Sequence, residues 1–450
     1  MRRREDFLLA RGGWTLGVVA WICLCVSAPA AVMTTGDVQP NPAASGSGDD
    51  LYVGKEDEGT MAVDGGSGVH CKVGFVGFKW SVDGLVTVDG PGASWTMAEQ
   101  LYVGFDGNGH MSVRNGAGVT NTFCLIADDH RSVSGVTVSG RGSTWTSTGN
   151  LYVGFDGAGA MTVEQGAAVT CAQGMIGDKF GSSGQVTITG GQSRWTNTTG
   201  LVIGYAGEGS LRVEDGASLA SATCTLGSVF EDAVGLAVIR GPGATWTTQG
   251  YLTIGFAGQG SVVIEDGAAV TNARGRLAGR VGSTGEVTVI GPGSSWHCGG
   301  NVEVAYAGFG RLKLINGGSV RTDADAWFAE EEDAVGEIWF AIGPDGSGRL
   351  DVAGDLVLDR DGHDRLKVTL EAGFTPTHGR TYDLIDWDGA LAGRFDAVEL
   401  EALPGGLLWD TSRLHVDGTI RVVPEPAALL LAGMGALALR RRRARRARRA

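Results

Sequence analysis

Two acidic stretches are the residues best suited to catalysis in this sequence. Asp128-Asp129 and the run from Glu330 to Asp333 place carboxylates side by side. A pair of carboxyl groups can cleave a glycosidic bond by acid and base catalysis. The irregular basic stretch from Arg274 to Arg280 is the other place where a polysaccharide lyase or hydrolase site would break the repeat. Exposed acidic loops explain the same residues without any chemistry, and we favour that interpretation.

Cysteine and histidine spacing offers no metal or nucleophile site. Neighbouring cysteines would lie about 9–10 Å apart, beyond disulfide reach, so we expect unpaired, small apolar core residues. No CxxC spacing suggests zinc. None of the seven histidines recurs in register with a Ser or Cys nucleophile. The cysteines that would remain after removal of an export signal are Cys71, Cys124, Cys171, Cys224 and Cys298.

Asp-Gly loops raise the question of calcium. Phe105–Gly109 and Phe155–Gly159 each contain one. Calcium-binding β-rolls need an Asp in every turn of a nine-residue repeat, whereas the matching positions here become Ala206 and Ala257. We therefore expect simple turns and no cofactor or metal.

Five tryptophans recur in phase, each just after a Gly-rich corner and between small residues. Such a column could form a carbohydrate-stacking stripe on the surface, or it could pack the corners of the fold. The small flanking residues favour packing. The five are Trp95, Trp145, Trp195, Trp246 and Trp296.

The elements that position these residues follow from a repeat. Glycine makes up 76 of the 450 residues without a triplet period, which excludes collagen. Leu51–Gly54 returns as Leu101–Gly104 and Leu151–Gly154, a period of 50. Each copy holds two half-copies of about 25 residues. The formal net charge is −14 although arginines crowd both ends, so an acidic body is a poor partner for nucleic acid.

Within each half-copy, apolar residues alternate with polar ones. Met111 and Val113 share one face, as do Val136 and Val138. Period two predicts strands, and glycines supply the positive φ of tight corners. We predict an all-β parallel β-helix, or β-solenoid, of 25-residue coils: ten to twelve coils, about 50 Å long. A β-sandwich or β-propeller is the alternative.

The domain boundaries follow from changes in this pattern. We expect a Gly/Ser/Pro linker at 31–50, solenoid repeats at 51–342, and a C-terminal β cap with a spacer at 343–422. The cap is needed because an open last coil exposes unpaired backbone groups.

The N-terminus is typical of an export signal. A basic region precedes a short apolar run from Trp14 to Val26, and Ala28 and Ala30 provide the small residues of a cleavage site. We expect residues 1–30 to be removed. The alternative, an uncleaved anchor, is disfavoured because the run is shorter than the ~20 residues of a membrane span. The arginines do not decide between the general secretory and twin-arginine routes.

The C-terminus carries a tripartite signal: Pro424, Glu425 and Pro426, an apolar helix at 427–439, and an arginine cluster at 440–449. Such an apolar helix stops in a membrane with its arginines on the cytoplasmic side. A cytosolic basic tail is the alternative. The signal resembles the PEP-CTERM sorting signal of Gram-negative-type bacteria, and the body, from about Leu51 to Arg349, resembles the autotransporter-like repeats of such proteins.

These resemblances imply a sequence of events. The protein would be exported, held in the inner membrane, processed by an exosortase-type enzyme, and moved to the cell envelope, cell surface or extracellular matrix. We expect a structural or adhesive protein without catalysis, with extracellular polysaccharide as its candidate ligand. A β-helix polysaccharide lyase or hydrolase is the alternative.

Overall fold

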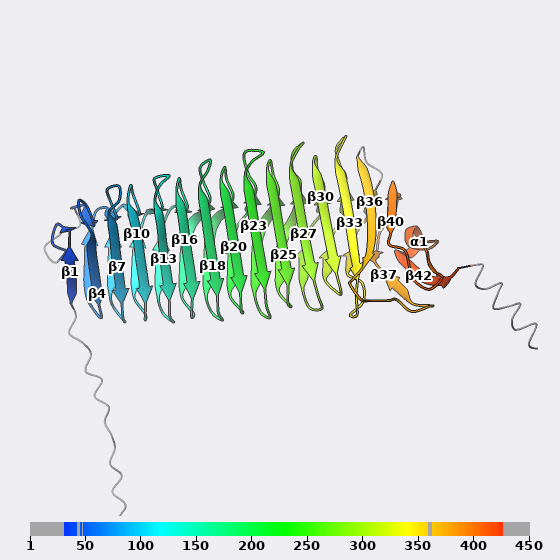
Figure 1. Ribbon diagram of the computed structural model, residues 1–450, viewed down its shortest axis with the longest axis horizontal. Coiled ribbons are helices and arrows are strands. Elements are labelled where there is room, and N and C mark those ends of the chain that lie inside the picture. Colours follow the sequence, from blue (N-terminus) through cyan, green and yellow to red (C-terminus); the bar gives the residue numbers. More distant parts are fainter. Residues whose placement is uncertain (1–30, 43–45, 47, 359–361, 426–450) are drawn as a thin grey trace, which may run out of the picture.

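The chain folds as one parallel β-solenoid. The computed structural model describes residues 31–42, 46, 48–358 and 362–425. Strands of successive coils lie side by side along the rod, and the first and last described strands, β1 (Val32–Gly36) and β42 (Thr419–Pro424), lie at opposite poles (Figure 1). The predicted all-β solenoid is confirmed. The sandwich and propeller alternatives are wrong, because in-register parallel pairing joins successive coils.

One 15-stranded sheet contains one strand from each coil, mostly seven residues long, and the cap strand β1 at its N-terminal edge. At about 4.8 Å per strand the rod is roughly 65–70 Å long, more than the 50 Å expected. The strands are β1 (Val32–Gly36), β4 (Gly59–Asp64), β7 (Asp83–Asp89), β10 (Asn108–Arg114), β13 (Val133–Ser139), β16 (Ala158–Glu164), β18 (Ser183–Thr189), β20 (Glu208–Glu214), β23 (Val234–Arg240), β25 (Gln259–Glu265), β27 (Thr284–Ile290), β30 (Phe309–Ile315), β33 (Val335–Ile342), β36 (His363–Leu370) and β40 (Ala397–Leu400).

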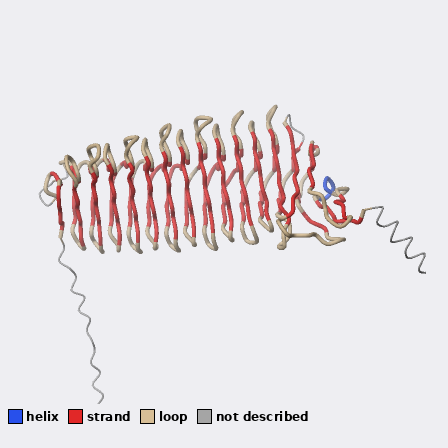
Figure 2. The backbone as a smooth tube through the Cα atoms, in the orientation of Figure 1, coloured by secondary structure: helices blue, strands red, loops and turns tan. Residues whose placement is uncertain are grey.

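Two series of shorter strands complete each coil (Figure 2). The first series is β5 (Gly68–Cys71), β8 (Ser94–Met97), β11 (Gly118–Asn121), β14 (Thr144–Ser147), β21 (Ser218–Ser221), β28 (Ser295–Cys298), β31 (Ser319–Thr322), β34 (Arg349–Val352) and β38 (Ile385–Trp387). The second is β3 (Leu51–Val53), β6 (Gly74–Val76), β9 (Gln100–Val103), β12 (Phe123–Ile126), β15 (Leu151–Val153), β22 (Cys224–Leu226), β29 (Val302–Val304), β32 (Ala326–Phe328), β35 (Leu356–Leu358) and β39 (Leu391–Gly393). Four strands run through both series: β17 (Ala168–Ile176), β19 (Arg194–Ile203), β24 (Thr245–Ile254) and β26 (Ala269–Leu277).

The core consists of aliphatic columns along the rod axis. Met111 of β10 pairs with Val136 of β13, and Val136 pairs with Met161 of β16. All three are at most 2% exposed. Each inward side chain therefore stacks on its counterpart one coil away, as the alternation predicts, and the polar residues between them face water.

Glycines serve two needs in each coil. Gly77 has φ +72° at a corner, where only glycine is unstrained. Gly84 begins the next long strand, and a Cβ there would lie 2.2 Å from Gly77 N and 2.3 Å from Val53 O. The second glycine is required by the close approach of three backbone segments, a reason that the sequence pattern alone did not reveal.

The expected linker at 31–50 is instead an N-terminal cap. β1 pairs antiparallel with β4, and β2 (Val38–Gln39) pairs antiparallel with β3. These strands cover the open edges of the first coil, so the boundary at 51 is wrong. Residues 43–45 and 47 of the expected linker lie outside the described residues.

The C-terminal boundary at 342 is also wrong. Parallel pairing continues through β34, β36, β38 and β40 to Leu400. The length of the solenoid was underestimated because the residues that mark each coil change in its last coils. Asp364 replaces the glycine near the start of the long strand, and Leu350 follows Val320 where earlier coils have tryptophan. The cap proper is an antiparallel sheet of β37 (Thr381–Asp383), β41 (Leu407–Asp410) and β42 (Thr419–Pro424), with the one-turn helix α1 (Leu414–Asp417).

The expected terminal segments lie outside the described residues. These are the export signal at 1–30, the apolar helix at 427–439 and the arginine cluster at 440–449. Within the described part of the chain, no helix has the length and apolar character needed to cross a membrane.

Candidate functional site

The tryptophan column lies in the core. The five in-phase tryptophans are at most 1% exposed. Each is flanked along the rod by an aliphatic residue, as Trp145 is by Val119 and Val169. The packing interpretation is confirmed, and the alternative of a carbohydrate-stacking stripe is wrong because these rings do not reach the surface.

The five cysteines are free and buried. Burial raises the pKa of Cys71 to about 11 and the pKa of Cys171 to about 12, so both sulfurs stay protonated at neutral pH. A thiol in this state is a poor nucleophile. The predicted role as small core residues is confirmed by their burial.

The two acidic stretches are not brought together. Asp128 and Glu330 occupy the same corner of the coil, each following a positive-φ alanine. They are separated by eight coils, about 38 Å at ~4.8 Å per coil. A carboxylate pair between the two stretches is therefore excluded by distance.

The basic stretch pairs with a carboxylate that lies outside both acidic stretches. Arg276 of β26 lies opposite Glu303 of β29, and its Nε bonds Glu303 Oε2. The guanidinium lies 4.0 Å from the centre of the Tyr306 ring. Burial lowers the pKa of Arg276, and the hydrogen bond and charge of Glu303 raise it. The negative charge of Glu330 raises it further by a smaller amount. Glu303 is 5% exposed, so its charge is neutralised inside this cluster.

The loops considered for calcium lie at bends between strands. Asp106 and Asp156 follow Phe105 and Phe155 at corresponding corners. Among the residues that the structure describes, no group of three or more His, Cys, Asp or Glu side chains is arranged to hold a metal ion. The closest histidine–carboxylate contact joins His297 Nε2 and Asp323 Oδ2 at 2.9 Å, and Arg321 bonds the same carboxylate.

An exposed aromatic cluster is the feature that the sequence interpretation missed. Tyr52, Phe75 and Tyr102 occupy the outward position of β3, β6 and β9, and their rings stack at 4.8 and 5.0 Å. Phe78 and Phe105 stack at 5.1 Å beside them and meet them edge to face. We call these five residues the aromatic face. The sequence feature that could have predicted this cluster is the outward-facing Tyr of each Leu-Tyr-Val-Gly sequence.

Phe78 and Phe105 also belong to a line of residues that we call the corner row. It holds one residue per coil, placed directly after the positive-φ corner that ends each second-series strand. Aromatic and acidic residues alternate from Phe105 to Tyr205. The row is Lys55, Phe78, Phe105, Asp128, Phe155, Asp178, Tyr205, Ser228, Phe256, Gly279, Tyr306 and Glu330.

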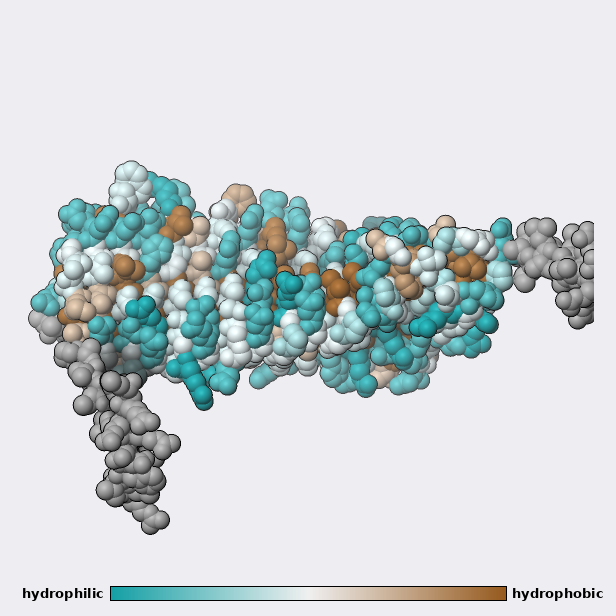
Figure 3. Space-filling model, turned by 60° about the horizontal axis from the view of Figure 1, so that its bottom comes forward, coloured by the Kyte–Doolittle hydropathy of each residue, from teal (hydrophilic) through white to brown (hydrophobic). Residues whose placement is uncertain are grey.

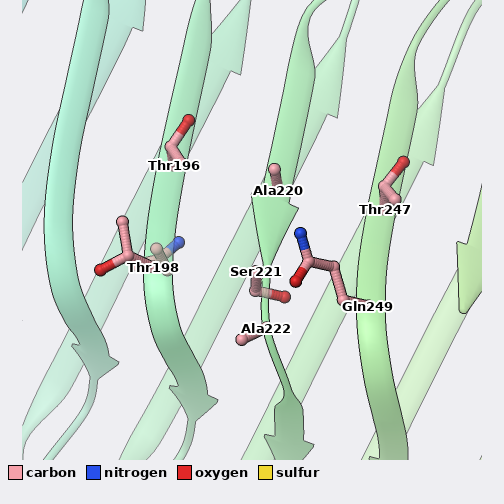
Figure 4. Close-up of a pocket in the computed structure, with 8 residues that line it drawn as sticks. Thr196, Thr198, Ala220, Ser221, Ala222, Thr247 and Gln249 are labelled. Atoms are coloured by element: carbon pink, nitrogen blue, oxygen red, sulfur yellow. The ribbon is translucent and has the colours of Figure 1, made fainter. Parts of the chain in front are cut away.

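A shallow groove of about 220 Å³ crosses β19, β21 and β24. Thr196 and Thr247 flank Ala220 on neighbouring coils, and the smaller alanine leaves the hollow between them (Figure 4). Gln249 reaches over its edge, and Ser221 is held by a 3.1 Å contact with Thr248. The lining is neutral and polar. Figure 3 shows one side of the rod, where small hydrophobic patches alternate with hydrophilic residues.

The sorting motif begins inside the folded cap. Pro424 is the last residue of β42 and pairs with Leu407 of β41. Glu425 N bonds Gly406 O at 2.8 Å. The expected spacer before the motif is therefore absent from the described residues, because β42 runs directly into it. Pro426, and the cleavage residues Ala28 and Ala30, lie outside the described residues.

Comparisons with known proteins support the C-terminal interpretation. Residues 422–446 match the PEP-CTERM protein-sorting motif. No curated protein matches the chain. Among solved structures, a hyper-glycosylated TibA fragment, whose glycosylation is TibC-catalysed, is similar at 15% identity and a TM-score of 0.31, covering 77% of this chain and 97% of the fragment. The motif marks the chain as an exported protein that an exosortase-type enzyme of the Gram-negative envelope recognises.

Proposed function

We propose that this protein is a structural or adhesive rod of the cell envelope or extracellular matrix, and that it acts without catalysis. The observation that supports this proposal is the continuity between the rod and its sorting signal: β42 closes the solenoid and also carries Pro424. The rod gains its stability coil by coil and requires no cofactor.

The proposed route has three stages. The signal at 1–30, cut after Ala30, directs export. The apolar helix at 427–439 then holds the protein in the inner membrane with the arginines inside. Processing at the Pro-Glu-Pro motif releases the rod to the envelope, the cell surface or the matrix.

The experiment replaces both prolines of the motif. The double variant Pro424→Ala/Pro426→Ala should stay in the inner-membrane fraction with its arginine tail intact, detected by an antibody to a tag inserted after the last arginine. Pro404→Ala, a matched loss of proline in the cap, should be processed normally. Normal release of the double variant would refute the sorting assignment.

The alternative function is polysaccharide cleavage, and one arrangement favours it. Arg276 pairs with Glu303 where the basic stretch breaks the repeat, and the charge of Glu330 also acts on this guanidinium. The test is a panel of uronate-rich and neutral polysaccharides, and we expect no turnover. Turnover that disappears in Glu303→Gln or Glu331→Ala, with the variants still folded, would establish an enzyme instead.

A further inference from the structure

The corner row contains two similar carboxylates with different partners. Asp128 and Asp178 lie one 50-residue repeat apart, each directly after the positive-φ residue of its corner. Asp128 lies between Phe105 and Phe155 along the row, and Asp178 lies between Phe155 and Tyr205. Backbone hydrogen bonds link these coils, for example Asp128 N to Gly104 O at 2.8 Å and Asp178 N to Gly154 O at 3.0 Å. The two residues therefore hold equivalent positions in their coils, although Asp178 is buried and Asp128 is only partly so.

The chain supplies an ammonium group to one of them. Lys179 Nζ lies 3.7 Å from Asp178 Oδ2 and 4.9 Å from the centre of the Phe155 ring. An ion pair and a cation–π contact thus act together on one ammonium. Lys55 Nζ lies over the Tyr52 ring at 4.4 Å, so the same preference recurs at the N-terminal end of the aromatic face.

Next to Asp128, the other carboxylate, the chain supplies an acidic residue in place of a lysine. Asp129 takes the position that Lys179 has in the next repeat, and its carboxylate instead pairs with His130 at 3.2 Å and Arg131 at 3.4 Å. Asp128 itself is half-buried. Within the described part of the chain its carboxylate has neither an ion pair nor a side-chain hydrogen bond.

The aromatic face adjoins this carboxylate. Tyr102 and Phe105, the C-terminal pair of the face, lie one coil from Leu125 and Asp128. All five rings of the face are partly exposed. A partner that covers the rings would bury apolar surface and would place any adjoining cation beside Asp128.

From these contacts we propose that the aromatic face, with Asp128, docks a polypeptide segment that presents apolar side chains beside a lysine. The lysine ammonium would be seated by Asp128 between Phe105 and Phe155, as Lys179 is seated by Asp178 against Phe155. Lysine is favoured over an amino sugar because the contact that serves as the template is itself made by lysine. The inference rests on the proposed role, since it requires that the protein act by binding.

The test uses purified mature protein and a fluorescent peptide of three leucines followed by one lysine. The matched probe carries acetyl-lysine, which removes the charge and keeps the length. Fluorescence anisotropy should show the lysine peptide binding roughly fivefold to tenfold more tightly than the acetylated one. Equal affinity for the two peptides, or no binding of either, would overturn the proposal.

Three variants locate the contact. Asp128→Asn should bring the lysine peptide down to the affinity of the acetylated one. Asp129→Lys should weaken binding similarly, because it supplies an ammonium from the chain. Asp178→Asn, the matched carboxylate, should leave binding unchanged. A lysine preference that survives Asp128→Asn in folded protein would overturn the assignment.

A glucosamine oligomer forms the last arm. If it binds through Asp128 and the peptide does not, the partner is a polysaccharide and the polypeptide proposal is wrong. Both binding measurements use purified protein, whereas sorting is measured in cell fractions. A negative binding result is therefore distinguishable from a negative sorting result.

Discussion

The indole Nε1 of Trp145 donates a 2.8 Å hydrogen bond to Oδ1 of Asn121, one coil earlier in the rod. Asn121 is 1% exposed and donates in turn to Ser147 Oγ at 3.0 Å. Trp296 and Asn272 repeat the contact at 2.5 Å. Next to Trp95 and Trp195 a cysteine takes the place of the asparagine. Burial raises the pKa of each thiol, and its contact with the indole lowers that pKa by a smaller amount. The core thus carries a polar line beside its tryptophans.

Removing Asn121 should destabilise the coils around it. Asn121→Ala leaves the Trp145 N–H and the Ser147 hydroxyl without their buried partner, which costs about 1–3 kcal/mol. Thr120→Ala, on the outward side of the same strand, should change stability by less than ~0.5 kcal/mol. Amide hydrogen exchange would localise the loss, since repeat proteins need not unfold as one unit. Equal exchange in the two variants would contradict this role.

Two glycines provide a sharp contrast. A Cβ at Gly184 would lie 2.1 Å from Val153 O, whereas nothing lies within 4 Å of a Cβ at Gly191. Gly184→Ala should lower stability by about 2–4 kcal/mol, because backbone must move. Gly191→Ala should be neutral or slightly stabilising, by up to about 1 kcal/mol, because it restricts the unfolded chain. Thermal denaturation followed by circular dichroism measures both, and similar melting temperatures would contradict the close approach.

Tryptophan fluorescence separates core from surface. Trp195 is fully buried and Trp80 is 61% exposed. Iodide quenches the fluorescence of exposed tryptophans and should not reach Trp195. Trp195→Phe should therefore reduce the emission that iodide leaves unquenched, and Trp80→Phe should reduce the emission that iodide quenches. Trp195→Ala should also cost about 3–5 kcal/mol through the cavity it leaves. Emission lost from the quenched fraction in Trp195→Phe would place that ring at the surface.

The stability of the rod should depend on pH through Asp128. Burial, with the nearby charges of Asp129 and Asp156, raises the pKa of this carboxyl to about 6 in the folded protein. The folded protein therefore favours the protonated carboxyl of Asp128. The stability that this protonation contributes is lost as the pH rises through about 6. Asp128→Asn should be more stable than the wild type by about 1 kcal/mol at pH 8, allowing for solvent screening. The difference should vanish near pH 4, and a constant difference across this range would contradict the assignment.

The interior of the rod could be predicted from the sequence because period-two alternation and a 25-residue repeat fix which residues face inward. Met111, Val136 and Trp145 were placed correctly on that basis. The outer surface could not be predicted in the same way. Asp128 follows Phe105 by 23 residues and precedes Phe155 by 27. These unequal half-repeats hide the fact that the three occupy one corner row.

The caps escaped prediction for a different reason. The sequences of β1 and β42 carry no repeat signature, so nothing in their local pattern identifies the strands with which they pair antiparallel. Likewise, the contact of Arg276 with Glu303 depends on the coil-to-coil register. The sequence identified the basic stretch as an interruption but did not identify Glu303 as its partner.

The placement of the two caps at opposite poles gives the molecule a direction. Because Pro424 is paired within the cap sheet, a force applied to that residue would pass through the cap into the coils. The aromatic face would then lie near the opposite pole, next to the N-terminal cap and some tens of ångströms from the anchoring surface, on the part of the rod that extends furthest toward a neighbouring cell or matrix fibre.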